Sequence, residues 1–401
     1  MLKTATRLDG YVQKGNKVTE REAVIALNMV PGIGAIMVKH VKERFGSCAA
    51  AFDASEADLS AVPLIGPARS RIFFRSMHEA DYAGEIARAA RNGVALTTWD
   101  DPAYPAELLK IPDPPLVFYS RGDMAALSRP CISMIGTRRA SIYGSETARR
   151  FAYQLAGAGY TVVSGLAHGI DTESHRGALQ AHGTTVGVLG GALNCFYPKE
   201  NTGLAKEMVE NGGAVITEYP FGREPDRQTF PMRNRIVSGL SKGVLVIESP
   251  LNGGTMITVK LALELGRPVM AVPGRVDSPS SQGCHRLIRE GARLVTNADE
   301  VLEELNDLFT GMGARRPDVP GLGKVAPRAS EDRPRAVLSP EERSVFSLLT
   351  PEGVGVDELV RRSGLDAGRV GAILIGLQIK RLARSLPGCR FASAAGAAGL
   401  G

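Results

Sequence analysis

Short apolar runs alternate with amphipathic segments through the middle of the chain. Seven of these runs have the length of buried strands, at residues 131–135, 160–164, 184–189, 214–217, 244–248, 268–272 and 292–295. Apolar residues recur at helical spacing in six further segments, at residues 143–157, 171–181, 200–211, 255–265, 283–290 and 298–308. Two earlier apolar runs, 94–97 and 115–119, add strands to the same region. The alternation predicts an α/β domain over residues 94–308, with a doubly wound, mainly parallel sheet.

A helical pattern precedes this region and predicts a separate domain over residues 1–91. Thr19 and Glu22 have the spacing of a capping box, which favours a helix that begins there. The phrase Pro31-Gly-Ile-Gly34 joins two helical segments, and a degenerate copy follows at 63–66. The repeat resembles paired helix-hairpin-helix units, whose glycine amides can hold a DNA phosphate. A purely structural helical domain fits the same pattern.

The C-terminal part of the chain differs again in composition. Residues 309–336 are rich in Gly, Pro and charge, which is typical of a flexible linker. Three helical segments and a hairpin then follow within residues 337–391, and this order resembles a winged helix. Residues 392–401 are of low complexity, so we expect a disordered tail.

The composition is that of a soluble globular protein with more than one domain. The 401 residues carry a net charge of +6, which permits a nucleic-acid partner without requiring one. The five cysteines are scattered and form no Cys-x-x-Cys pair, so we expect no disulfide and no metal site. No secretion signal precedes the first helix, and no apolar run is long enough to span a bilayer. We therefore expect a cytoplasmic protein that does not contact a membrane.

The stretch around Gly136 combines a strand, a tight turn and a helix N-terminus. Unpaired amides and the helix dipole at such a turn attract anions. Arg138 and Arg139 lie within the turn, and a guanidinium can bond two phosphate oxygens at once. The turn therefore predicts a phosphate site, although an ordinary strand–helix connection with solvated arginines fits it too.

Three other segments share this mixture of glycine, cationic and aromatic residues, at 164–175, 190–201 and 230–235. Ligands of doubly wound sheets bind beyond the carboxyl ends of the strands, where we expect these segments to meet. Cationic side chains bind phosphates, and aromatic rings such as Tyr197 and Phe230 stack on bases. The constellation indicates a site for single-stranded nucleic acid.

Catalytic interpretations of the second segment are weaker. His168, Asp171 and His175 suggest a metal site, and Ser164 with Asp171 and His175 suggests a nucleophilic triad. A third well-spaced metal ligand is missing from the sequence. Asp171 begins a helix, so we expect it to cap that helix, and we expect His175 to pack or to bind a backbone carbonyl.

Seven motifs follow one another within residues 94–308. They are Ile135-Gly-Thr-Arg138, Ser164-Gly-Leu-Ala-His-Gly-Ile-Asp171, Tyr197-Pro-Lys-Glu-Asn201, Phe230-Pro-Met-Arg-Asn-Arg235, Gly254-Thr-Met-Ile-Thr258, Gly266-Arg-Pro-Val269 and Ala271-Val-Pro-Gly274. This ordered set resembles the DNA-processing protein A family (DprA, also called Smf). The resemblance implies a Rossmann-like central domain, flanked by a helical domain similar to a sterile-alpha-motif (SAM) fold and by a winged helix.

The resemblance also implies a function. Members of this family bind and protect single-stranded DNA, dimerise through the Rossmann-like domain and load the recombinase RecA during natural transformation and recombination. The resemblance implies no catalytic step and no cofactor.

The family's main DNA-contacting arginine matches Arg138, and its second basic contact matches Lys199. Two positions depart from the family pattern. His168 replaces a basic residue, which removes most of one positive charge at neutral pH. Gly253-Gly-Thr255 replaces the usual Ser-Gly-Ser. The full candidate DNA-binding set is Gly136, Thr137, Arg138, Ser141, Gly165, Leu166, Gly190, Gly191, Lys199, Asn201, Phe230, Arg233, Asn234 and Arg235.

Two other functions fit parts of the chain. Nucleotide phosphoribohydrolases of the lysine-decarboxylase-like group carry an arginine and a glycine-rich motif that Arg233 and residues 253–255 resemble. Thr258 stands where those enzymes have a glutamate, so the group that would stabilise a glycosyl cation is missing. A winged-helix transcription regulator that acts through residues 338–391 is the other alternative.

Overall fold

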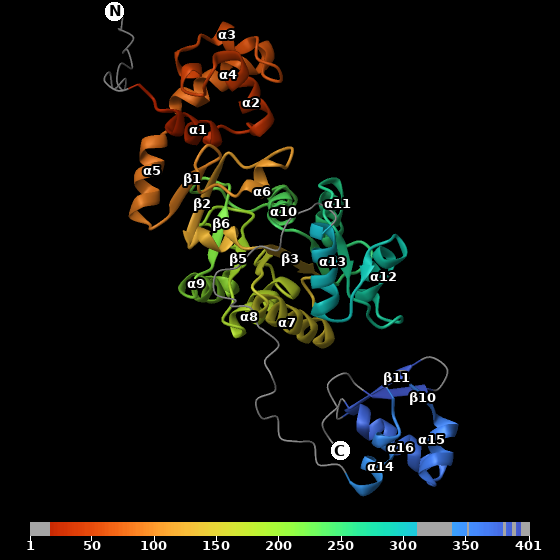
Figure 1. Ribbon diagram of the computed structural model, residues 1–401. Helices are drawn as coiled ribbons and strands as arrows, with labels where there is room; N and C mark the ends of the chain where they lie inside the picture. The colour runs from red at the N-terminus through yellow and green to blue at the C-terminus, as the bar shows by residue number, and fades with distance from the viewer. Residues whose placement is uncertain (1–16, 311–338, 351–352, 380–381, 387–389, 394–401) are drawn as a thin grey trace, which may run out of the picture. The chain divides into compact units, whose positions relative to one another are not determined.

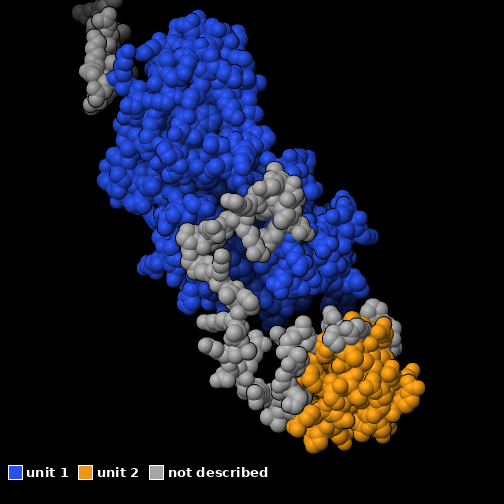
Figure 2. All heavy atoms as spheres, viewed as in Figure 1, with its two compact units in different colours: residues 1–316 blue, residues 317–401 orange. Residues whose placement is uncertain are grey.

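The computed structural model describes residues 17–310, 339–350, 353–379, 382–386 and 390–393. It divides into two compact units, residues 1–316 and residues 317–401 (Figure 2). Most of the predicted linker, at 311–336, lies outside the described residues. Residues 394–401 of the predicted tail lie outside them as well.

A nine-stranded sheet forms the centre of the first unit (Figure 1). The strand order is β1-β2-β6-β5-β4-β3-β7-β8-β9, with parallel pairing from β6 to β9 and antiparallel pairing of β1 with β2 and of β2 with β6. The strands are β1 (Ala95–Thr98), β2 (Val117–Gly122), β3 (Cys131–Gly136), β4 (Thr161–Ser164), β5 (Thr185–Val188), β6 (Ala214–Thr217), β7 (Val244–Glu248), β8 (Val269–Ala271) and β9 (Arg293–Leu294). The predicted α/β fold with a doubly wound, mainly parallel sheet is confirmed. From β3 the chain proceeds through β4 and β5 to β6 on one side, and it then returns to the other side of β3 and proceeds from β7 to β9. The switch point of the sheet therefore lies between β3 and β7.

Helices cover both faces of this sheet, because alternate residues of each strand point to opposite sides. In β7, Val244 and Val246 join the larger apolar cluster, whereas Leu245 and Ile247 join a second cluster on the opposite face. The second cluster includes residues of α7 (Ile142–Gly157), α8 (Ile170–Gln180) and α13 (Ala298–Thr310). Residues of α9 (Thr202–Glu210) belong to a separate, smaller apolar cluster. The larger cluster includes residues of α10 (Thr229–Leu240), α11 (Thr255–Glu264) and α12 (Gln282–Arg289).

The helix α10 was not predicted from the hydrophobic pattern. Its first half, Thr229-Phe-Pro-Met-Arg-Asn-Arg235, mixes polar and apolar residues and contains a proline, and the larger apolar cluster takes Ile236, Val237 and Leu240 from the second half. A proline in the first helical turn, followed by apolar residues at positions 236, 237 and 240, is a helix-start signal that could have revealed α10.

The described residues before the sheet are helical, as the sequence predicted, and contain five α-helices. They are α1 (Glu20–Met29), α2 (Ala35–Phe45), α3 (Glu56–Ser60), α4 (Gly66–Glu79) and α5 (Tyr82–Arg91). Thr19 and Glu22 form the predicted capping box. The hairpin between α1 and α2 contains Gly32, whose φ of 77° lies in the left-handed region that favours glycine. Residues of α1 share the larger apolar cluster with Phe118 of β2, so the predicted boundary between residues 91 and 94 stays a prediction.

The second unit is a winged helix, as the sequence predicted. It contains α14 (Pro340–Ser347), α15 (Val356–Ser363) and α16 (Ala367–Ile379), together with a small sheet in the order β10 (Val354–Gly355), β12 (Arg390–Ser393) and β11 (Ala383–Leu386). Its own apolar cluster includes Val345, Leu359, Val370 and Leu374. Short helices elsewhere in the chain are α6 (Ala106–Leu109) and the 3-10 helices η1 (Ala50–Asp53), η2 (Met124–Ser128), η3 (Lys199–Asn201) and η4 (Pro279–Ser281).

Candidate nucleic-acid interface

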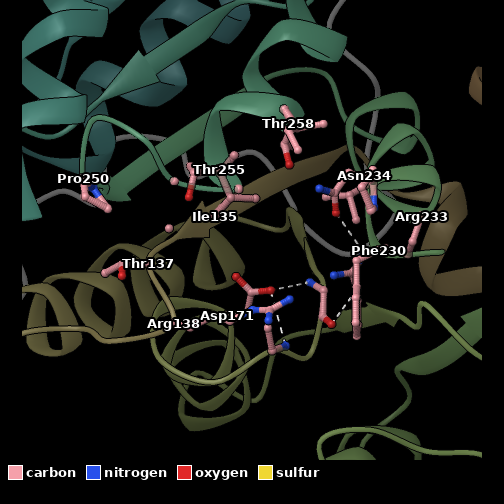
Figure 3. Close-up of a pocket in the computed structure, with 18 of the residues that line it drawn as sticks. Ile135, Thr137, Arg138, Asp171, Phe230, Arg233, Asn234, Pro250, Thr255 and Thr258 are labelled. Atoms are coloured by element: carbon pink, nitrogen blue, oxygen red, sulfur yellow. Dashed lines mark hydrogen bonds between the residues drawn. The ribbon is translucent and has the colours of Figure 1, made fainter. Parts of the chain in front are cut away.

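A cavity of about 500 Å³ lies at the switch point of the sheet, beyond the carboxyl ends of β3 and β7 (Figure 3). Its lining comes from the turn after β3, the turn after β4 with the start of α8, the helix α10 with the residues before it, and the loop after β7 with the start of α11. Its cationic lining residues are Arg138, Arg139, Arg227 and Arg233. The structure therefore places the cavity where ligands of doubly wound sheets bind.

Arg138 and Phe230 meet at this cavity. Arg138 lies in the exposed turn between β3 and α7, and Phe230 lies in the first turn of α10. The Arg138 guanidinium carbon is 5.0 Å from the centroid of the Phe230 ring, which is within cation–π distance. Phe230 also lines a smaller hollow, where the exposed Tyr197 ring lies 6.0 Å from the Phe230 ring. One positive charge and two aromatic rings thus occupy adjacent positions.

Arg233 forms a charged part of the cavity wall. Arg233 is only 5% exposed, and its guanidinium donates to the carbonyl oxygens of Gly165, at 2.5 Å, and Val188. Burial lowers the pKa of Arg233 to about 10, and the nearby Asp171 carboxylate opposes that shift. Arg233 therefore stays protonated at neutral pH and joins α10 to the ends of β4 and β5.

Asp171 stabilises the turn after β4. The prediction that it caps its own helix is wrong, because no side chain caps α8. Its carboxylate accepts hydrogen bonds from the amides of Gly165, at 3.1 Å, and Ala167, at 3.4 Å. Burial raises the pKa of Asp171, although Arg233 and these amides oppose the shift. The turn bends at Leu166, whose φ of 54° lies in the left-handed region. Asp171 accordingly stabilises a backbone conformation that leucine rarely adopts.

Two candidate residues support this turn instead of lining the cavity. Leu166 is fully buried in an apolar cluster. The Asn201 side-chain amide donates to the Leu166 carbonyl oxygen at 2.8 Å and to the Thr172 hydroxyl at 2.9 Å. Both side chains therefore fix the turn from behind.

The amides at the start of α7 are less free than the sequence predicted. The Ser141 amide donates to Glu248 Oε2 at 2.9 Å, and the Gly144 amide donates to the Ser141 hydroxyl at 3.0 Å. The Thr137 amide donates to the Glu248 carbonyl oxygen at 2.7 Å. Glu248 ends the neighbouring strand β7, so an internal carboxylate takes the place that the sequence assigned to a phosphate. The turn still carries the positive charges of two exposed arginines, Arg138 and Arg139, which attract anions.

Arg235 forms buried ion pairs and is not among the residues that line the cavity, so its membership of the DNA-binding set stays a prediction. Its guanidinium donates to both oxygens of Glu218, at 2.8 and 2.6 Å, and to Asp113 at 3.2 Å. These carboxylates raise the pKa of Arg235, against the effect of its burial. Asp113 also accepts from the amide of Ala35, the first residue of α2. Arg235 thus connects α10 to the N-terminal helices.

The candidate residues divide into three groups. Those that line the cavity are Gly136, Thr137, Arg138, Gly165, Phe230, Arg233 and Asn234. Gly190 lines the smaller hollow, and Lys199 is exposed beside Pro198 of that hollow. The supporting residues are Ser141, Leu166, Gly191, Asn201 and Arg235. A single phosphate pocket shared by Arg138 and Lys199 therefore stays a prediction.

Several lining residues were missing from the predicted set. They are Arg139, Arg227, Gly253, Gly254, Thr255, Ile257 and Thr258, among others. Glycines directly after the strand 244–248 were the available signal, because the carboxyl end of β7 faces the same crevice as the end of β3. His168 lines the smaller hollow and lies 3.8 Å from the Glu200 carboxylate.

The catalytic alternatives are not assembled around His175. The Ser164 hydroxyl donates to the Met134 carbonyl oxygen, and His175 Nδ1 bonds the Thr185 hydroxyl at 2.6 Å. Burial lowers the pKa of His175 to about 3. In the described parts of the chain, no three His, Cys, Asp or Glu side chains are grouped to hold a metal ion. No described helix combines the length and the apolar character that crossing a membrane would require.

Comparisons with known proteins agree with this geometry. The sequence profile described as DNA recombination-mediator protein A matches residues 95–306, and that of the DprA winged helix domain matches residues 329–389. Protein Smf of Escherichia coli (strain K12) is 37% identical over 289 residues, which are 72% of this chain and 75% of that protein. DNA processing protein DprA of Streptococcus pneumoniae is 41% identical over 204 residues, 51% of this chain and 72% of that protein.

The X-ray structure of DNA processing protein A (DprA) from Streptococcus pneumoniae is similar to this chain, with a TM-score of 0.62 and 32% identity. The match covers 72% of this chain and 99% of that one. The similarity thus extends beyond the segment matched by the first profile.

Proposed function

The chain belongs to the DNA recombination-mediator protein A family, and on this premise we propose that it binds single-stranded DNA at the cavity between β3 and β7. The observation that carries the proposal is the position of the Arg138 guanidinium over the Phe230 ring at the cavity. A cation beside an aromatic face suits a single strand, because the phosphate and the unpaired base of one nucleotide can be bound together. A duplex hides its bases inside the stack and cannot use the ring.

We further propose that a homodimer, formed through the Rossmann-like domain in the cytoplasm, protects the bound strand and loads RecA onto it. This step would serve natural transformation and homologous recombination. Family membership supports this part, because the matching profile is that of a recombination mediator. No catalytic step is included in the proposal.

Binding of the full-length chain to a single strand and to a duplex of the same sequence tests the proposal. We expect single-strand affinity to exceed duplex affinity at physiological salt, and Arg138→Ala and Phe230→Leu to weaken the single-strand complex. Equal affinity for both forms, unchanged by either substitution, would refute the proposed site. For the finer part, RecA filament formation on a strand coated with single-strand-binding protein should be faster when the chain is present.

A further inference from the structure

The start of α11 forms one wall of the cavity and offers backbone amides that the chain does not use. Residues Gly253 and Gly254 precede the helix, and no side chain caps it. Among the described residues, none accepts a hydrogen bond from the amides of Gly253, Gly254 and Thr255. In the view of Figure 3, Thr255 and Thr258 lie above the cavity and Arg138 and Asp171 below it. Unpaired amides and the helix dipole give this wall a partial positive charge.

Two hydroxyls in the same wall also lack a partner. Thr255 is 7% exposed and Thr258 is 4% exposed, and both line the cavity. Neither hydroxyl bonds any residue that the structure describes, and neither is among the atoms sealed from solvent without a partner. Because both hydroxyls open onto the cavity and have no partner among the described residues, both are available to hydrogen-bond a ligand that enters it.

We propose that the start of α11, with the Thr255 hydroxyl, is a subsite for the terminal phosphate monoester of a nucleotide. This group occurs at a 5′-phosphorylated strand end and in a nucleoside 5′-monophosphate. It carries between one and two negative charges at neutral pH and has three terminal oxygens. A phosphodiester within a strand has one charge and two such oxygens, so it uses a compact set of amides and a hydroxyl less fully. The inference rests on the proposed function, because it places the end of the bound strand in the same cavity.

The charges around the cavity are compatible with this ligand. Arg138, Arg139 and Arg227 are exposed cationic residues of the lining. The Asp171 carboxylate also belongs to the lining, but it accepts from two amides and is partly neutralised by the charge of Arg233. The volume of about 500 Å³ is within the range of cavities that hold small ligands.

Thr255→Val is the sharpest test, because it keeps the shape of the side chain and removes only the unpaired hydroxyl. The probes are short oligothymidylates with a 5′-phosphate or a 5′-hydroxyl, bound to the full-length chain. We expect the parent to bind the phosphorylated probe about tenfold more tightly, as one charged hydrogen bond with supporting amides provides. Thr255→Val should lose most of that preference, so that its affinities for the two probes become similar, with an unchanged or higher melting temperature.

Gly254→Ala provides a second variant that should fold. The φ of Gly254 is −57°, and an added Cβ would meet no heavy atom within 4 Å. The methyl group would lie beside the free amides, so this variant should also lose the preference for the phosphorylated probe. A parent with equal affinity for both probes, or a Thr255→Val variant that keeps the preference, would overturn the inference.

Competition distinguishes the two sources of the phosphate. If thymidine 5′-monophosphate displaces the phosphorylated probe at comparable concentration, the subsite accepts free nucleotides. If only the phosphorylated strand competes, the subsite reads strand ends. Failure of the proposed function gives a different result: a chain that does not bind single strands would not bind the 5′-hydroxyl probe at all.

Discussion

The guanidinium of Arg138 lies 5.0 Å from the centroid of the Phe230 ring, although one residue follows β3 and the other begins α10. The contact depends on both elements being held in place. Glu248 fixes the turn that carries Arg138, through the amides of Thr137 and Ser141. Arg233 fixes α10 against the ends of β4 and β5. The candidate site is therefore built before any ligand arrives, with its supporting charges buried and Arg138 exposed.

We expect Phe230→Leu to weaken single-strand binding by about 1–3 kcal/mol, because the ring offers a stacking face that leucine lacks. Phe230→Tyr keeps that face and is the matched control. Fluorescence anisotropy with an oligothymidylate probe measures both affinities. Equal affinity of the leucine variant and the parent would mean that Phe230 only packs against Arg138.

Arg235→Met should destabilise the chain by about 3–5 kcal/mol, because it leaves the carboxylates of Glu218 and Asp113 without their buried partner. Arg223→Met is the control, since it breaks an exposed pair with Asp226 and should cost far less stability. Denaturant unfolding measures both changes. A stable Arg235→Met variant that no longer binds single strands would instead show that Arg235 contacts DNA.

His175 makes the stability of the chain sensitive to acid. Its pKa is about 3 in the folded chain against 6.5 for an ordinary histidine, so the unfolded chain takes up the proton first. The stabilising effect of this difference is complete above pH 6.5 and is lost as the pH falls toward 3. In that window the parent should lose up to about 1.4 kcal/mol per pH unit relative to His175→Gln.

The raised pKa of Asp171 acts in the opposite direction, because its protonation at low pH favours the folded chain. Both proteins contain Asp171, so its effect cancels in the comparison with His175→Gln. Parallel stability curves for the two proteins from pH 7 to pH 4 would show that His175 does not titrate as its burial implies.

We expect no release of free base from nucleoside 5′-monophosphates. Thr258 lines the cavity at the position where the nucleotide phosphoribohydrolases, whose glycine-rich motif residues 253–255 resemble, have a glutamate. A neutral hydroxyl cannot supply the charge that a glycosyl cation requires. Chromatography of the nucleotide after long incubation measures the product. Base release at an enzymatic rate, abolished by Arg233→Ala, would instead assign the cavity to a hydrolase.

The sequence predicted the sheet well because most of its strands are short, largely apolar and separated by helical patterns. The same logic located Arg138 and the turn after β4, since ligands collect at the carboxyl ends of parallel strands. The helix α10 was missed because its first half mixes polar and apolar residues without a clear helical period. The ion pairs of Arg235 could not be predicted, because the sequence does not show that Glu218 and Asp113 surround it.

The amides at the two helix starts show the same limit. A sequence reveals a glycine turn before a helix but not which acceptors surround it. At α7 an internal carboxylate, Glu248, occupies the Ser141 amide, whereas at α11 the described residues leave the amides without an acceptor. The difference arises because β7 pairs with β3, which brings the Glu248 carboxylate to the start of α7.

The salt dependence of single-strand binding tests the central claim most directly. Each phosphate contact on a single strand contributes about −0.7 to the slope of log K against log salt concentration. We expect Arg138→Ala to weaken binding and to flatten the slope by about that amount, and the double variant with Lys199→Ala to flatten it by about twice as much. The melting temperature should hardly change, because both side chains are exposed. An Arg138→Ala variant that binds single strands as tightly as the parent, at low and at high salt, would contradict the account.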